Sequence, residues 1–136
     1  MKVACTTAKE RTYIPSCLKN KKQPESERIR IVYSTPTSKM KEDLLAVKMS
    51  YVQDENGKTS PNMSINISKF EIISKMLVRI DNFIYVDKDD PTKETVVTGV
   101  DELFNAPTDS GAIDLIDELY KVFMEVLNGK AISEKN

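Results

Sequence analysis

Four carboxylates recur at helical spacing near one end of this sequence: Asp114, Asp117, Glu118 and Glu125. Carboxylates on one side of a helix can hold metal ions or share proton transfer, as in two-metal enzymes and glycosidases. The positions between them are filled by apolar residues, however, and such alternation is typical of an amphipathic helix whose acids face water. We therefore interpret the four acids as the solvated face of a helix and not as a catalytic centre.

Two other short segments carry residues that could do chemistry. Asp87 to Asp90 resembles the start of a calcium loop, but the sixth position of such a loop needs glycine for its sharp turn, and Thr92 stands there after Pro91. A polar hairpin turn explains this segment better. Ser110 precedes a glycine, yet the chain contains no histidine that could activate a serine nucleophile.

The absence of histidine removes the commonest metal ligand and the commonest general base together. No phosphate-binding loop or dinucleotide fingerprint can be built either, because every glycine is isolated from the others. The glycines are Gly57, Gly99, Gly111 and Gly129. The sequence therefore predicts a protein that is not an enzyme, with no catalytic, cofactor-binding or metal-binding residues and no cofactor.

Charge is nearly balanced over the 136 residues, with a net charge of −1, so a nucleic-acid or membrane partner has no electrostatic support. The two halves differ in sign. Residues 1–58 contain 12 Lys and Arg against 7 Asp and Glu, and residues 59–136 contain 8 against 14. This asymmetry could orient a partner, but we favour the interpretation that it helps the halves pack together. A nucleic-acid-binding regulator that uses the basic half stays open as an alternative.

Cysteine content and the N-terminal residues bear on the compartment. Cys5 and Cys17 do not make a disulfide framework, and free thiols in a reducing cytosol are favoured over a single bridge. No apolar run reaches the length of a membrane helix, and the segment Met1–Arg11 becomes charged too early for a signal peptide. We expect a soluble protein that is intracellular where it is made.

The sequence predicts an extended basic arm over residues 1–28, anchored by Tyr13 and Ile14, followed by a single α+β domain over residues 29–136. Proline and a lysine-rich run argue against regular structure in the arm. The segment from Lys48 to Val52 is compatible with helix or strand, and we favour strand. The other elements predicted in this half are a strand at 29–34, a helix at 38–46, a turn at 53–62 and a return strand at 63–67.

Ser68 and Glu71 are spaced as a capping box, which predicts the start of a central helix over Lys69 to Ile80. The elements predicted after it are a hairpin of strands 83–86 and 95–98, a short helix at 100–105 and a long last helix at 109–128. Short strands joined by polar turns, with two main helices, indicate a small antiparallel sheet. Strand 29–34 and the hairpin are both expected in it.

The last helix has more apolar surface than a surface helix needs. One stripe contains Ile113, Ile116, Tyr120, Phe123 and Leu127, and an adjacent stripe contains Leu115, Leu119, Val122 and Val126. We expect one stripe to close the core and the other to meet a second chain, and the sequence does not say which. Accordingly, Leu119→Glu with Val126→Lys is expected to leave the domain folded if the second stripe is the contact. As the protein interface the sequence predicts Leu115, Leu119, Tyr120, Val122, Phe123 and Val126.

Two blocks of the chain carry a further pattern. The first block runs from Tyr13 through Pro24–Glu27 to IRIVYSTPT at 29–37. The second block joins LVRIDNF at 77–83, an acidic turn, VVTGVDELFNAP at 96–107 and DLIDELYKVF at 114–123. Together these blocks resemble the tail assembly chaperone type of small protein from tailed bacteriophages.

The resemblance implies a protein that holds tail tube and tape-measure proteins in solution while a phage tail assembles. It also implies a helical middle, which conflicts with the hairpin predicted at 48–67. The location that the resemblance implies is the host cytoplasm, or alternatively a virion. A structural subunit of a virion or other complex is the alternative function, and a homo-oligomer is left open.

Overall fold

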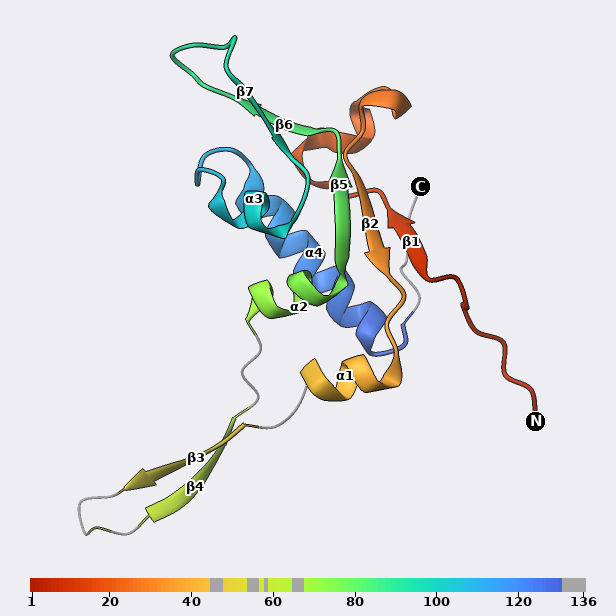
Figure 1. Cartoon of the computed structure of the whole chain (residues 1–136), viewed down its shortest axis with the longest axis vertical. Coiled ribbons are helices and arrows are strands. Elements are labelled where there is room, and N and C mark those ends of the chain that lie inside the picture. The colour runs from red at the N-terminus through yellow and green to blue at the C-terminus, as the bar shows by residue number, and fades with distance from the viewer. Residues whose placement is uncertain (45–47, 54–56, 58, 65–67, 131–136) are drawn as a thin grey trace.

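The computed structural model describes residues 1–44, 48–53, 57, 59–64 and 68–130 (Figure 1). The strands are β1 (Glu10–Tyr13), β2 (Arg30–Ser34), β3 (Lys48–Gln53), β4 (Thr59–Ser64), β5 (Leu77–Asp81), β6 (Phe83–Val86) and β7 (Glu94–Val97). The helices are α1 (Ser38–Leu44), α2 (Lys69–Met76), α3 (Val100–Asn105) and α4 (Ala112–Leu127), with two 3-10 turns, η1 (Cys17–Lys22) and η2 (Glu25–Glu27). The predicted α+β class is confirmed.

β2 is the central strand of an antiparallel sheet ordered β1-β2-β5. Its residues are mostly β-branched or aromatic, which suits a strand paired on both sides. Ile31 faces Tyr13 of β1 and Ile80 of β5, so one face of the sheet is apolar. This face packs on α4, where the rings of Tyr33 and Phe123 lie 5.4 Å apart between centroids.

The core is thus formed between the sheet and α4, with α2 and α3 adding side chains to it. Its largest fully buried side chains include Tyr33, Phe123, Ile31, Ile72, Ile73, Met76, Ile80, Leu103, Leu115 and Leu119.

Two hairpins project from this body (Figure 1), β3–β4 and β6–β7. The prediction that hairpin 83–98 joins the sheet of β2 is wrong, because within the described residues β6 and β7 pair only with each other. Asn82 explains the separation: its backbone has φ +67°, and its side-chain amide donates to the carbonyls of Ser26 and Arg28. Asparagine tolerates this left-handed conformation, which turns the chain out of β5 before β6 begins.

The middle of the chain forms the hairpin that the residue pattern predicts and not the helical segment that the resemblance implies. β3 pairs with β4 throughout, from Lys48 opposite Ser64 to Gln53 opposite Thr59. The return strand was predicted at 63–67 but occupies 59–64, so it contains Pro61. Gln53 and residues 59–62, which were predicted as turn, thus belong to strands, and residues 65–67 lie outside the described residues.

The central helix predicted over Lys69–Ile80 is wrong in its last four residues, from Leu77 to Ile80. The cap is as expected, since the amide of Glu71 donates to Ser68 Oγ at 3.1 Å. The helix ends at Met76, however, and β5 begins at once without a loop. Leu77 and Ile80 are three residues apart, which is helical spacing, but an irregularity in the β2–β5 register pairs them with Tyr33 and Ile31, which lie on one face of β2. The free edge of β2 favours the strand because pairing satisfies its backbone groups.

The prediction of an extended arm over residues 1–28 is also corrected. β1 pairs with β2, and η1 and η2 follow it. Asn20 is buried, and its side chain bonds backbone groups on both sides of it in the chain. Its amide donates to the carbonyls of Pro15 and Ile29, and its Oδ1 accepts from the amide of Ile29 at 2.6 Å. Leu18 and Lys19 both have positive φ, a conformation that costs about 1–2 kcal/mol for each L-residue. The contacts around them must offset that strain.

α4 begins at Ala112, three residues after the predicted start, and ends before Gly129 as expected. Gly111 precedes the helix with φ +93°. A Cβ at this position would lie 2.8 Å from Cδ2 of Leu18, so both the backbone conformation and the contact with η1 favour glycine. Within the described residues, no helix combines the length and the apolar character needed to cross a bilayer.

Candidate protein-contact surfaces

Most of the predicted interface residues on α4 lie in the core of the domain. Five of the six, Leu115, Leu119, Val122, Phe123 and Val126, are buried, and Tyr120 is half-buried. The stripe that begins at Leu115 therefore closes the core. A partner could reach only Tyr120 of this set while the domain stays folded.

The other stripe is divided along its length. Phe123 and Leu127 are buried, Ile116 and Tyr120 are half-buried, and Ile113 has an exposed fraction of 48%. These last three side chains follow one another at intervals of three and four residues, so they share one side of α4.

Two aromatic residues of α2 and α3 contact each other near the surface. Phe70 of α2 is 44% exposed and meets the ring of Phe104 of α3 edge-on, with 5.1 Å between ring centroids. Lys69 joins α2 to α4: its ammonium lies 2.6 Å from Asp117 and 5.7 Å from the centroid of Tyr120.

A second apolar surface lies on the hairpin β6–β7. Ile84 pairs directly with Val96, and Val86 lies two residues beyond Ile84, so all three point to the same side of the hairpin. Their exposed fractions are 49%, 52% and 49% for Ile84, Val96 and Val86. We call these three residues the hairpin face. The opposite side of the hairpin carries Phe83 and Val97, which are buried in the core.

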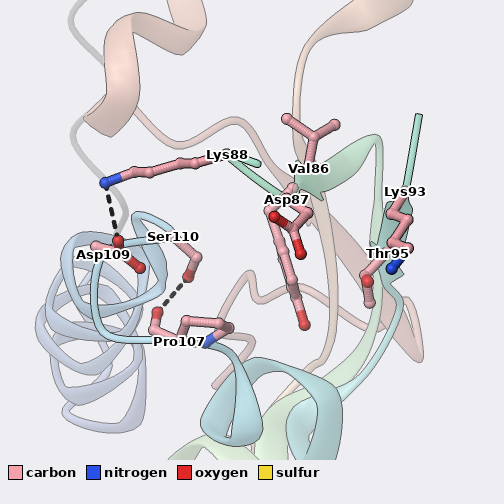
Figure 2. A pocket seen from close by; sticks show the side chains of 9 residues that line it. Val86, Asp87, Lys88, Lys93, Thr95, Pro107, Asp109 and Ser110 are labelled. Carbon is pink, nitrogen blue, oxygen red and sulfur yellow. Dashed lines mark hydrogen bonds and ion pairs between the residues drawn. The ribbon is translucent and has the colours of Figure 1, made fainter. Parts of the chain in front are cut away.

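An open groove of about 400 Å³ separates the β6–β7 turn from the loop before α4 (Figure 2). Lys88 and Asp109 meet across its rim at 3.0 Å, and the hydrogen bond and charge of Lys88 lower the pKa of the Asp109 carboxyl. Its other lining residues are Tyr85, Val86, Asp87, Lys93, Thr95, Pro107 and Ser110.

The acids of this turn serve the hairpin itself. Asp87 Oδ1 accepts from the amides of Asp89 and Asp90, which is the geometry of a capped turn. In the same region the hydroxyl of Ser110 donates to the carbonyl of Pro107 at 2.6 Å. Among the residues that the structure describes, no three or more Cys, Asp or Glu side chains gather as a metal site would require. The hydrogen bonds to Asp87 agree with the interpretation of Asp87 to Asp90 as a hairpin turn.

Glu118 has a role that the sequence did not indicate. It was predicted to lie on the solvated face of the last helix, but its carboxylate accepts four hydrogen bonds from the N-terminal segment. The donors are the Tyr13 hydroxyl at 2.9 Å, the Ser16 amide at 2.8 Å, the Ser16 hydroxyl at 3.0 Å and the Cys17 amide at 2.8 Å. Since these donors lie more than 100 residues earlier in the chain, no local pattern around Glu118 could have revealed them.

The two cysteines are free thiols, as the sequence predicted. Burial, together with the nearby carboxylates of Glu118 and Asp114, raises the pKa of Cys17 from 9.0 to about 12. Because the thiolate is the reactive form, Cys17 should be a poor nucleophile at neutral pH.

This shift predicts slow alkylation of Cys17. In a Cys5→Ser variant, iodoacetamide at pH 8 should label Cys17 much more slowly in the native chain than in guanidinium, as measured by mass spectrometry. The folded state holds a proton that the unfolded state releases above pH 9.0, so the free energy of unfolding should fall as pH rises from 9.0 towards 12. Equal labelling rates in the native and unfolded chains would contradict this assignment.

Comparison of the chain with protein-family models, with curated proteins and with solved structures found no match. Function must therefore be inferred from the surfaces that the chain itself presents.

Proposed function

We propose that this chain is a non-enzymatic assembly protein of a tailed bacteriophage, which works by contact with tail tube or tape-measure proteins. The resemblance of its two sequence blocks to tail assembly chaperones motivates the identity of the partners. The hairpin face supports the mode of action, since it presents apolar side chains on an element that projects from the body (Figure 1).

Contact of a partner with the hairpin face would be favourable because its apolar side chains would leave water. Full burial of a Val- or Ile-sized side chain contributes roughly 1.5–3 kcal/mol. Ile84, Val86 and Val96 are each about half exposed, so a partner that covered them would recover part of that free energy. Exposed apolar patches on strands also promote unspecific pairing, which a matching partner prevents.

Affinity capture tests this proposal. A tagged chain is purified from the organism that encodes it, and bound proteins are identified by mass spectrometry. The test variant is Ile84→Thr with Val96→Thr, which keeps β-branched residues in the strands but removes apolar surface. The control is Lys93→Gln with Glu94→Gln, which changes polar residues of the same hairpin and leaves the hairpin face intact.

We expect a tail tube or tape-measure protein with the natural chain and the control, and much less of it with the threonine variant. Recovery of neither tail protein would reject the assembly function. Stoichiometric presence of the chain in finished particles would instead favour a structural subunit of the virion.

A further inference from the structure

We propose that the N-terminal strap of this chain, residues 8–17, is exchanged between two copies, so that the strap of each copy completes the fold of the other. The strap contains β1 and runs from one edge of β2 to the Glu118 carboxylate on α4 (Figure 1). It lies apart from the hairpin face, so the inference goes beyond the assembly function and does not depend on it.

The strap is fastened by contacts that a second copy can make equally well. Its backbone pairs with β2 from Glu10 to Tyr13, and Glu118 accepts hydrogen bonds from Tyr13, Ser16 and Cys17. None of these contacts requires donor and acceptor to belong to one molecule. Another copy carries the same donors at the same spacing, so its strap fits the same strand edge and the same carboxylate.

A strained hinge follows the strap directly. Leu18 has φ +58° and Lys19 has φ +53°, and each L-residue in this left-handed conformation loses roughly tenfold in an equilibrium constant. Leu18 is 39% exposed and Lys19 is exposed, so extending them unpacks little of the core. An exchanged dimer keeps the contacts of the strap and releases this strain at both of its hinges, which is the condition that favours exchange.

Asn20 limits the hinge to these two residues. Its hydrogen bonds to both backbone groups of Ile29 hold it to the body, whereas its bond to the carbonyl of Pro15 reaches back into the strap. In the exchanged dimer this last bond would be made to the Pro15 of the second copy. From Cys17 to Asn20 an extended chain spans at most about 10 Å, so the two bodies would meet beside η1.

Refolding of the full chain from urea at low and at high protein concentration tests the proposal, with light scattering after size exclusion giving the mass. The variant Glu10→Cys with Ser34→Cys, in a Cys5→Ser background, locates the strap. These two residues are opposite each other, and the adjacent bond from the Thr35 amide to the Lys9 carbonyl makes theirs a close, non-hydrogen-bonded pair suited to a disulfide. Non-reducing electrophoresis shows whether that disulfide lies within one chain or joins two.

The natural chain should be a monomer after dilute refolding and a dimer after concentrated refolding, with the introduced disulfide joining the two chains of the dimer. Lys19→Gly should lower the association constant about a hundredfold, because glycine removes the penalty at each of the two hinges. The matched control is Lys22→Gly. It removes the same charge from η1 at an exposed position whose φ is not positive, so this variant should dimerise at least as strongly as the natural chain.

Three results would overturn the proposal. The first is a natural chain that stays monomeric at every refolding concentration. The second is a dimer in which the introduced disulfide lies only within single chains, since the copies would then meet through another surface. The third is equal dimerisation of Lys19→Gly and the natural chain, which would show that the hinge does not drive exchange. Capture of tail proteins through the hairpin face is a separate result and could succeed or fail independently.

Discussion

Leu119→Glu should unfold the domain, whereas Ile113→Glu on the same helix should leave it folded. Leu119 is fully buried in the hydrophobic core, so a carboxylate there would be removed from water among apolar side chains. Burial of an unpaired charge costs more than about 4–5 kcal/mol, which approaches the whole stability of an ordinary domain. Ile113 is about half exposed, and exposed substitutions usually change stability by no more than about 0.5 kcal/mol.

Circular dichroism during urea unfolding measures both variants. The expected result corrects the sequence-based expectation that Leu119→Glu with Val126→Lys could leave the domain folded, since both residues belong to the core. A folded Leu119→Glu variant with unchanged unfolding midpoint would show that α4 does not pack as described. Loss of structure in Ile113→Glu would show instead that the exposed side of α4 is covered.

Glu118→Ala should release the N-terminal segment from α4 and destabilise the chain by about 2–4 kcal/mol. Each hydrogen bond to a charged group contributes about 1.5–3 kcal/mol, but the four donors share one carboxylate and some can turn to water, so their sum is smaller than four independent bonds. Asp117→Ala is the matched control. It removes the neighbouring carboxylate, whose ion pair with Lys69 is about half exposed to solvent on both side chains, and surface ion pairs contribute about 0–1 kcal/mol.

Urea unfolding gives the stability difference, and hydrogen exchange locates it. The amides of Ser16 and Cys17 donate to Glu118, so their hydrogen-exchange rates should rise in Glu118→Ala. In Asp117→Ala the same rates should equal those of the natural chain. Equal effects of the two substitutions would mean that the hydrogen bonds to Glu118 stabilise the chain no more than a surface charge does. If the expected difference is found, η1 is held in place mainly from α4, over a distance of about 100 residues in sequence.

Local signals in the sequence determined much of this fold. The Ser68 cap, the polar turn after Val86 and the glycine after α4 each specify a backbone conformation through residues that are close together in the chain. The start of α2, the turn of the β6–β7 hairpin and the end of α4 therefore lie where they were predicted. The β-branched and aromatic residues at 29–34 likewise indicated β2. The α+β class follows from these short-range patterns.

Tertiary contacts decided what the local patterns left open. Leu77 to Asp81 could continue a helix or form a strand, and the free edge of β2 made it a strand. Both stripes of α4 are apolar, and only the position of the sheet buries Leu115 and Leu119 while Ile113 stays exposed. Glu118 looked like any exposed acid of an amphipathic helix. Its role depends on four donors brought from the other end of the chain, and a one-dimensional pattern carries no information about such partners.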